Sequence, residues 1–176
     1  VLKHADRFGF KAIISGGAEA WMVAEELAEA DVPVLLNPLQ NLPSSFNALG
    51  SRLDNAALLH AAGVTIAFSG AGSHNARKLR QMAGNAVTNG LPHDAALAAL
   101  TRNPAEIFGV ANRQGSIEKG TPANLVLWSG DPLEVTTLAD MVVINGQNMP
   151  MVSRQTQLRD RYLPEDPEMP RAYIKP

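Results

Sequence analysis

Cysteine is absent from the 176 residues of this chain, which excludes disulfides and zinc sites built on thiolates. The same absence is compatible with an oxidising and with a reducing compartment. The net charge is only −2, so a broad electrostatic interface for nucleic acid is not expected. No run of about 18 apolar residues occurs, so no membrane span is expected either. Hydrophobic residues make up 45% and charged residues 18%, a composition typical of a globular domain with a real core.

The first residues of the chain have the pattern of the C-terminal part of a helix. Leu2, Ala5 and Phe8 are spaced to share one helical face, and Gly9 is placed to end it. The first residue is Val1 and the segment does not resemble a signal peptide. We therefore expect the coding sequence to begin upstream of Val1.

Apolar runs and helical patterns alternate through the first half of the chain. The pattern predicts strands at 11–15, 32–37 and 64–68, with helices at 18–30 and 53–62. The runs are continuously apolar, as in parallel strands covered on both faces. This is βα architecture, and the pattern alone does not separate a doubly wound sheet from a barrel. The polar loop 38–50 is long enough to suggest a functional role, and its prolines argue against a helix there.

In the second half, the predicted secondary structure changes from helices to strands near Arg113. Before it, helices are predicted at 75–89 and 93–101, then an interruption at Asn103-Pro104 and one more turn at 105–108. After it, strands are predicted at 125–128, 141–144 and 147–152, and Asn145-Gly146 is a strong hairpin signal. These features divide the chain into an α/β part at 1–112, a β module at 113–152 and a tail at 153–176. The tail is expected to form a short helix and an extended arm.

The junction of the two parts carries a family resemblance. Residues 95–109 read AALAALTRNPAEIFG, residues 115–128 read GSIEKGTPANLVLW, and residues 142–146 read VVING. This order resembles the C-terminal end of the amidohydrolase superfamily, especially its imidazolonepropionase-like and peptidase-like enzymes. The resemblance implies an α/β fold made of the last three βα units of a (β/α)8, TIM-type barrel. Part of a small β-sandwich module would follow, whose partner strands come from the N-terminal part of such enzymes.

The resemblance also implies a divalent metal, usually zinc, at the mouth of the barrel. Most of its ligands in the family would lie upstream of Val1. Within this chain the resemblance implies a His after the first strand and an Asp after the third. Ser15 and Ala71 occupy or adjoin those positions, and no acidic residue occurs between Asp54 and Asp94. We therefore expect no metal ligand, and no bound metal, from this chain.

The candidate site residues follow the predicted strands, because barrel active sites lie on the loops at the carboxyl ends of the strands. His74 is the candidate catalytic residue, since a histidine can move a proton near neutral pH. Arg77 could pair with a substrate carboxylate. The candidate substrate-binding residues are Asn37, Asn41, Ser69, Ser73, Asn75 and Arg77.

Structural roles for the same residues stay open. His74 and Asn75 could cap the following helix, Asn37 and Asn41 could satisfy the loop backbone, and Arg77 could be a surface residue. His4, His60 and His93 lack partners at a suitable spacing and are interpreted as structural or solvated.

Two functions remain open. The first is a metal-dependent hydrolase of C–N bonds in amides, cyclic amides or dipeptides, of which this chain alone is expected to be inactive. The second is a non-catalytic relative that lost the His and Asp and binds a ligand or a partner. A small-molecule substrate and a homo-oligomer are expected, without nucleic acid or membrane. The compartment is periplasmic or cytoplasmic, and the resemblance slightly favours the periplasm.

Overall fold

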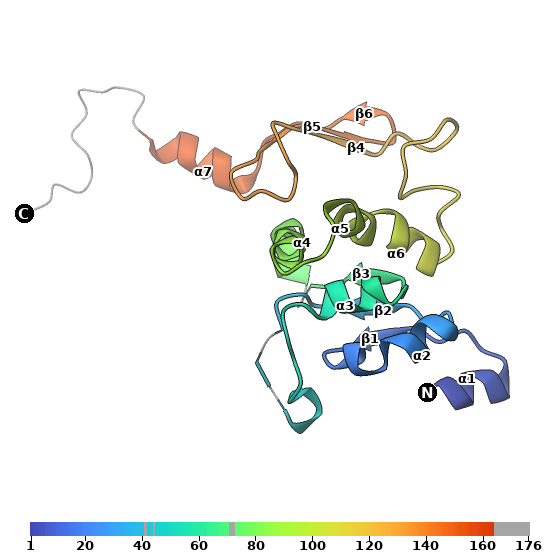
Figure 1. Cartoon of the computed structure of the whole chain (residues 1–176). Coiled ribbons are helices and arrows are strands. Elements are labelled where there is room, and N and C mark those ends of the chain that lie inside the picture. Colours follow the sequence, from blue (N-terminus) through green and yellow to red (C-terminus); the bar gives the residue numbers. More distant parts are fainter. Residues whose placement is uncertain (41, 44, 71–72, 164–176) are drawn as a thin grey trace, which may run out of the picture.

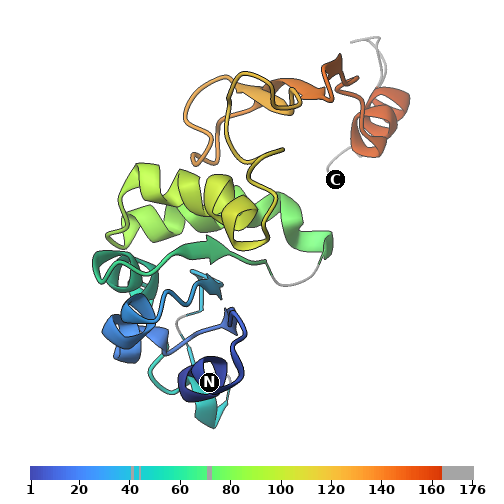
Figure 2. The same cartoon turned by 90° about the vertical axis from the view of Figure 1, so that its right-hand side faces the viewer.

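A computed structural model describes residues 1–40, 42–43, 45–70 and 73–163 of the chain. Two of the sequence positions discussed above, Asn41 and Ala71, lie outside the described residues. The chain forms three layers that follow the sequence (Figures 1 and 2). A parallel sheet with its helices is followed by a helical layer and then by an antiparallel sheet. The fold is therefore α/β, with one parallel and one antiparallel sheet.

The parallel sheet has the order β1-β2-β3. Its strands are β1 (Ile14–Gly16), β2 (Val34–Leu36) and β3 (Ile66–Phe68). They are in register, with Gly16 opposite Leu36 and Leu36 opposite Phe68, so their carboxyl ends form one edge. Each strand is shorter than the apolar run that predicted it. Hydrogen bonds outside the ladder, such as that from Val64 N to Leu59 O, occupy the first residues of the third run instead.

Helices connect the strands, as the alternating pattern predicted. The first part contains α1 (Leu2–Phe8), η1 (Ala20–Val23), α2 (Ala24–Glu29), η2 (Phe46–Ala48) and α3 (Asn55–Ala61). The helix expected at 18–30 is split into a 3-10 segment and a short α-helix. The loop after β2 contains the 3-10 turn η2, so its prolines exclude an α-helix but not all helical structure.

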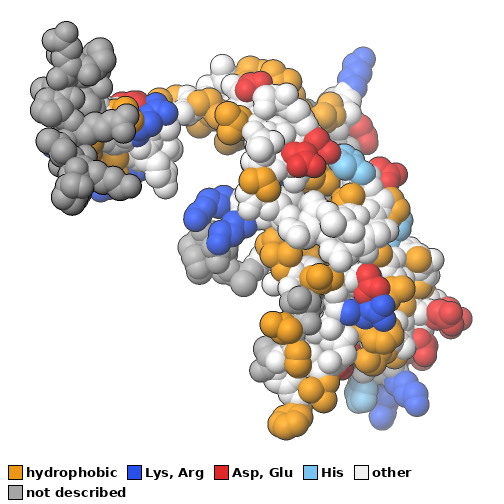
Figure 3. Space-filling view, turned by 60° about the vertical axis from the view of Figure 1, so that its left-hand side comes forward, with side chains coloured by type: hydrophobic (Ala, Val, Ile, Leu, Met, Phe, Trp, Pro, Cys, Tyr) orange, Lys and Arg blue, Asp and Glu red, His pale blue; other side chains and the backbone are white. Residues whose placement is uncertain are grey.

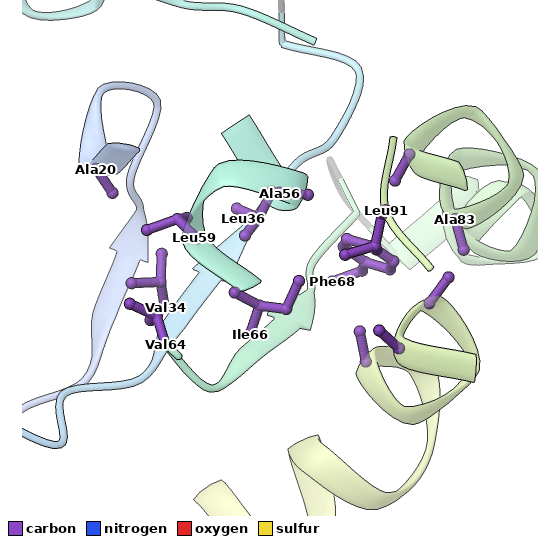
Figure 4. Packing of buried hydrophobic residues seen from close by; sticks show 14 of the residues in the cluster. Ala20, Val34, Leu36, Ala56, Leu59, Val64, Ile66, Phe68, Ala83 and Leu91 are labelled. Atoms are coloured by element: carbon purple, nitrogen blue, oxygen red, sulfur yellow. The ribbon is translucent and has the colours of Figure 1, made fainter. Parts of the chain in front are cut away.

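The hydrophobic core lies between the parallel sheet and the helices that cover it. Leu59 of α3 lies near the strand residue Val34, and Leu91 lies beside Phe68 (Figure 4). The strands β2 and β3 are almost fully buried, as the continuous apolar runs predicted. The edge strand β1 differs, because Ser15 and Gly16 are exposed and β1 is paired only with β2 in the described part of the chain.

The middle layer is helical. It consists of η3 (Ser73–Lys78), α4 (Leu79–Thr88), α5 (His93–Leu100) and α6 (Arg102–Ile107). The expected interruption at Asn103-Pro104 was wrong, because both residues belong to α6. Pro104 is the third residue of that helix, where its missing N–H would have had no partner within the helix. The side chain of Asn103 donates to Ile66 O at 2.9 Å and so ties α6 to β3.

The antiparallel sheet has the order β4-β5-β6. It consists of β4 (Leu125–Trp128), β5 (Ala139–Ile144) and β6 (Gln147–Asn148). The hairpin at Asn145-Gly146 is confirmed, and both residues have positive φ, 50° and 78°. The return strand is shorter than the segment 147–152 that the sequence predicted. A groove of about 1030 Å³ separates β4 and β5 from α5 and α6, and its lining is mostly apolar.

Three side chains join the antiparallel sheet to the helical layer. The guanidinium of Arg80 donates to the carbonyl oxygens of Pro132, Glu134 and Thr137 and stacks on the Trp128 ring. Leu133 is buried in the core cluster of the first part. His93 Nε2 lies 2.8 Å from the carboxylate of Asp131, whose pKa is lowered chiefly by the Leu133 N–H and further by His93. The structural role that the sequence left open for His93 is therefore confirmed, through a partner, Asp131, that the spacing did not reveal.

The described chain ends with α7 (Arg154–Tyr162), as the expected tail helix. Ser153 and Thr156 form a reciprocal capping box at its first turn. The helix has no buried residue and extends away from the rest of the molecule (Figure 1). The expected extended arm lies outside the described residues. Among the helices of the described ranges, none combines the length and the apolar character that crossing a membrane requires.

Candidate functional site

The carboxyl edge of the parallel sheet is the candidate site, because all three strands end there. Asn37 follows β2 directly and Ser69 follows β3 directly. Ser69 N donates to Leu36 O at 2.9 Å, so this residue continues the pairing of the two strands for one step. Ser15 lies in β1, one residue before its end, and is exposed. The structure thus brings Asn37 and Ser69 to one edge, as the sequence predicted, and places Ser15 one residue further back.

The side chain of Asn37 is partly committed to its own loop. Its Oδ1 accepts a hydrogen bond from Leu39 N at 3.0 Å, which closes a local turn. The Nδ2 group of this amide is the part that a substrate carbonyl could engage. The loop-stabilising role that the sequence left open for Asn37 is therefore real, and a binding role for the same residue stays a prediction.

The segment after β3 carries the other candidate residues. Ser73, His74 and Asn75 belong to the backbone of η3, but their side chains lie outside the described part of the structure. Arg77 is in the same 3-10 segment and its side chain is exposed. The backbone therefore places all four residues on the loop and turn that leave β3. The roles of His74 and Arg77 stay predictions.

The described donor atoms at this edge, which do not include the side chain of His74, do not fit a divalent metal site. The strand ends present a serine hydroxyl, an amide and a second hydroxyl at Ser15, Asn37 and Ser69, none of them anionic or an imidazole. Zinc is bound in proteins by thiolate, imidazole and carboxylate groups. Across residues 1–40, 42–43, 45–70 and 73–163, no group of three or more His, Cys, Asp or Glu residues is placed to hold a metal ion. No catalytic step through a metal is therefore derived for this chain.

Sequence reasoning missed a network that holds the loop after β2, residues 38–54. Asn55 is 5% exposed, and its side chain accepts from Trp21 N at 3.1 Å and donates to Gly17 O at 2.9 Å. Glu19 Oε1 accepts from Gly50 N at 2.6 Å, and Trp21 Nε1 donates to Gly50 O at 2.9 Å. The partners are 29 to 38 residues apart, and the sequence has no signal of that range. We call Glu19, Trp21, Gly50 and Asn55 the loop clasp.

An ion pair lies beside the loop clasp. Arg52 hydrogen-bonds the carboxylate of Asp54, and this bond holds the pKa of Asp54 below its ordinary value. The guanidinium carbon of Arg52 also lies 4.7 Å from the centre of the Trp21 ring. The return segment of the loop is therefore packed on the turn that follows β1.

Comparison with known proteins agrees with this arrangement. A sequence model described as the amidohydrolase family matches residues 10–153, which is most of the chain. The chain belongs to the amidohydrolase family. The family resemblance noted in the sequence is thereby confirmed.

Among similar proteins, an amidohydrolase from Thermotoga maritima has a crystal structure that superposes with a TM-score of 0.77 at 32% identity. The match covers 84% of this chain and 39% of that one. The amidohydrolase tasK of Hapsidospora irregularis is 44% identical over 57 residues, 32% of this chain and 6% of that protein. An adenosine deaminase from Xanthomonas campestris, crystallised with zinc, has a TM-score of 0.61 at 23% identity, covering 91% of this chain and 45% of that one. This chain thus spans less than half the length of these proteins.

Proposed function

We propose that this chain is the C-terminal part of an amidohydrolase-family hydrolase that acts on C–N bonds of amides, cyclic amides or dipeptides. The observation that carries the proposal is the match of residues 10–153 to the family, together with three parallel strands whose ends present polar side chains at one edge. In this proposal β1, β2 and β3 are the last three strands of a (β/α)8 barrel. Three strands do not close a barrel, which takes roughly 200 residues or more.

In the proposed enzyme this chain binds and orients the substrate. Ser69 and the Nδ2 group of Asn37 are neutral donors that could hold a substrate carbonyl oxygen. The exposed Arg77 could pair with a substrate carboxylate, and His74 could transfer a proton at the scissile nitrogen. A divalent metal bound elsewhere in the assembled protein would supply the hydrolytic water, because no group of three or more His, Cys, Asp or Glu among the described residues of this chain is placed to hold one. The 176-residue chain alone is therefore expected to be inactive.

A second candidate function is a non-catalytic amidohydrolase relative that binds a ligand or a partner. The specific observation in its favour is the neutral character of the strand ends, where Ser15 stands in place of the family histidine. A barrel that keeps its shape but has neutral residues at its strand ends could still bind a polar small molecule through the same amide and hydroxyl groups.

The test uses the protein that carries this chain together with the sequence preceding Val1. It is assayed with added zinc against a panel of amides, cyclic amides and dipeptides, alongside the 176-residue chain. Turnover by the longer protein and none by the chain is the expected result. A double variant, Ser15→His with Ala71→Asp, separates the two candidates. Turnover that arises only in this variant favours the non-catalytic relative, and no turnover in either contradicts the hydrolase.

A further inference from the structure

In the described residues, the hydrogen bonds that tie the loop after β2 to the turn after β1 lie where the loop returns to α3. Its return segment is fixed through both backbone atoms of Gly50, whose N–H bonds Glu19 and whose carbonyl oxygen bonds Trp21. The Asn55 side chain then fixes Trp21 N and the carbonyl of Gly17. The loop clasp therefore connects the loop of one strand to the turn after the neighbouring strand.

The outer part of the same loop is held by little burial. Phe46 is 92% exposed, Leu42 is 73% exposed and Leu49 is 64% exposed. Apolar side chains gather at the foot of the molecule in Figure 3, where Figure 1 places η2. Ala48 is the exception in this segment at 4%. Because the large side chains of the outer loop contribute little packing, the orientation of the loop depends mainly on the hydrogen bonds at its stem.

The backbone of Gly50 lies close to the side chains of Met22 and Glu19. A Cβ atom added to Gly50 would lie 2.3 Å from Met22 Cε and 3.3 Å from Glu19 Oε1. The hydrogen bond from Gly50 N to the carboxylate involves an ionised acceptor, and such bonds are about twice as strong as neutral ones. The close approach of the Gly50 backbone to Glu19 and Trp21 is thus specific to this geometry.

We propose that Glu19 and Trp21 are positioning residues that hold the loop of residues 38–54 at the carboxyl edge of the parallel sheet. The loop begins directly after Asn37, and in this proposal it forms one wall of the candidate site. Resting on the proposed hydrolase, the inference adds that this wall sets the affinity for the substrate and leaves the chemical step to other residues. Glu19 touches neither reacting atom in this scheme and acts through the loop.

Hydrogen exchange of the Gly50 amide in the 176-residue chain tests the positioning role without any substrate. Glu19→Ala should raise the exchange rate of this amide about tenfold or more, because it removes a charge-assisted hydrogen bond. Glu19→Gln should restore most of the protection, since its side-chain carbonyl still accepts. Glu25→Ala is the matched control, an exposed carboxylate on the neighbouring helix. Amides of β3 report global unfolding in each variant, so a loss of fold is distinguished from release of the loop.

An unchanged Gly50 rate in Glu19→Ala, with β3 still protected, would overturn the proposal. Steady-state kinetics of the longer protein then tests the consequence for affinity, with the best substrate of the panel. Glu19→Ala should raise KM about tenfold and leave kcat within about threefold, and Glu19→Gln should recover the KM. A fall in kcat at constant KM would contradict a positioning role. Absence of turnover in the parent would contradict the proposed hydrolase and leave the exchange result to decide the loop clasp.

Discussion

At the scale of single residues, the side-chain amide of Asn55 connects the start of α3 to the turn after β1 through hydrogen bonds with Trp21 N and Gly17 O. It is a buried polar side chain, and within the described residues every buried side-chain polar atom has a hydrogen-bond partner. Removing one member of such a network leaves its partners unsatisfied in a place that water reaches poorly. The stability of the first part should therefore depend strongly on this one side chain.

We expect Asn55→Leu to lower the free energy of unfolding by about 2–4 kcal/mol, because Gly17 O and Trp21 N would lose their partner. Asn55→Asp should also destabilise the chain, since a carboxylate accepts from Trp21 N but cannot donate to Gly17 O and places a charge at a buried site. Urea denaturation followed by tryptophan fluorescence measures both. Gln157→Ala, an exposed amide on α7, is the control and should stay within about 0.5 kcal/mol. Equal stability of Asn55→Leu and the natural chain would show that the amide network contributes little.

The sequence distinguishes Asn55 from Asn37 poorly. Both are asparagines at the end or near the start of a predicted element, and only Asn37 was assigned a role from its neighbours along the chain. Asn37 was placed at the strand edge correctly, because parallel strands bring their carboxyl ends together and the pattern predicted the strands. The role of Asn55 depends on partners in a different loop, so no local pattern could predict it. The partner of His93 was missed for the same reason, since Asp131 is 38 residues away.

At the scale of elements, the helices and strands of this chain were predictable in type and order but not in their ends. The apolar runs predicted the three parallel strands. The length of each strand depends on which of its backbone groups form hydrogen bonds with neighbouring loops instead of with another strand. At Pro104 the sequence predicted a break where the structure has a continuous helix. Its proline character suggested a break, yet a proline in the first turn of a helix costs little because that turn has free N–H groups anyway.

Helix α4 meets the segment 130–138 at Gly84, which gives a prediction at this scale. A Cβ on Gly84 would lie 2.8 Å from the carbonyl oxygen of Leu133. Gly84→Ala should favour the helix by up to about 1 kcal/mol. The clash with backbone should outweigh that gain, so we expect a net destabilisation of about 1–3 kcal/mol.

Thermal or urea unfolding measures the effect of Gly84→Ala. The neighbouring exposed residue supplies the control, because Asn85→Ala adds helix propensity at a position without such a contact with Leu133. A stabilised Gly84→Ala protein would contradict this expectation, because it would mean that the backbone at Leu133 shifts to accept the methyl group at little cost.

At the scale of the whole molecule, apolar surface is left uncovered in several places. Strand β1 is an edge strand, and the groove between the antiparallel sheet and the helices is lined by residues such as Leu125 and Met141. Leu127 is 56% exposed and Ile117 is 85% exposed. Exposed strand edges and apolar patches of this kind favour association with another chain or another segment.

We therefore expect the 176-residue chain to self-associate as its concentration rises, measured by light scattering coupled to size-exclusion chromatography. Leu127→Lys should weaken the association, because it places a charge on the exposed face of β4, and should leave the secondary structure measured by circular dichroism unchanged. Lys119→Leu, on the segment that precedes β4, is the opposite change and should strengthen the association, because it removes a charge and adds exposed apolar surface. A compact monomer at millimolar concentration would contradict this expectation.

Leu133 belongs to the predicted β module at 113–152, yet its side chain is buried in the hydrophobic core of the α/β part at 1–112. Arg80 fastens the same segment through three carbonyl oxygens. Recombination at the apparent boundary near residue 112 would therefore exchange a core residue together with the β module. A substitution at Gly84 in one lineage would call for a compensating shift near Leu133. The two parts are thus expected to be inherited as one unit and to vary together.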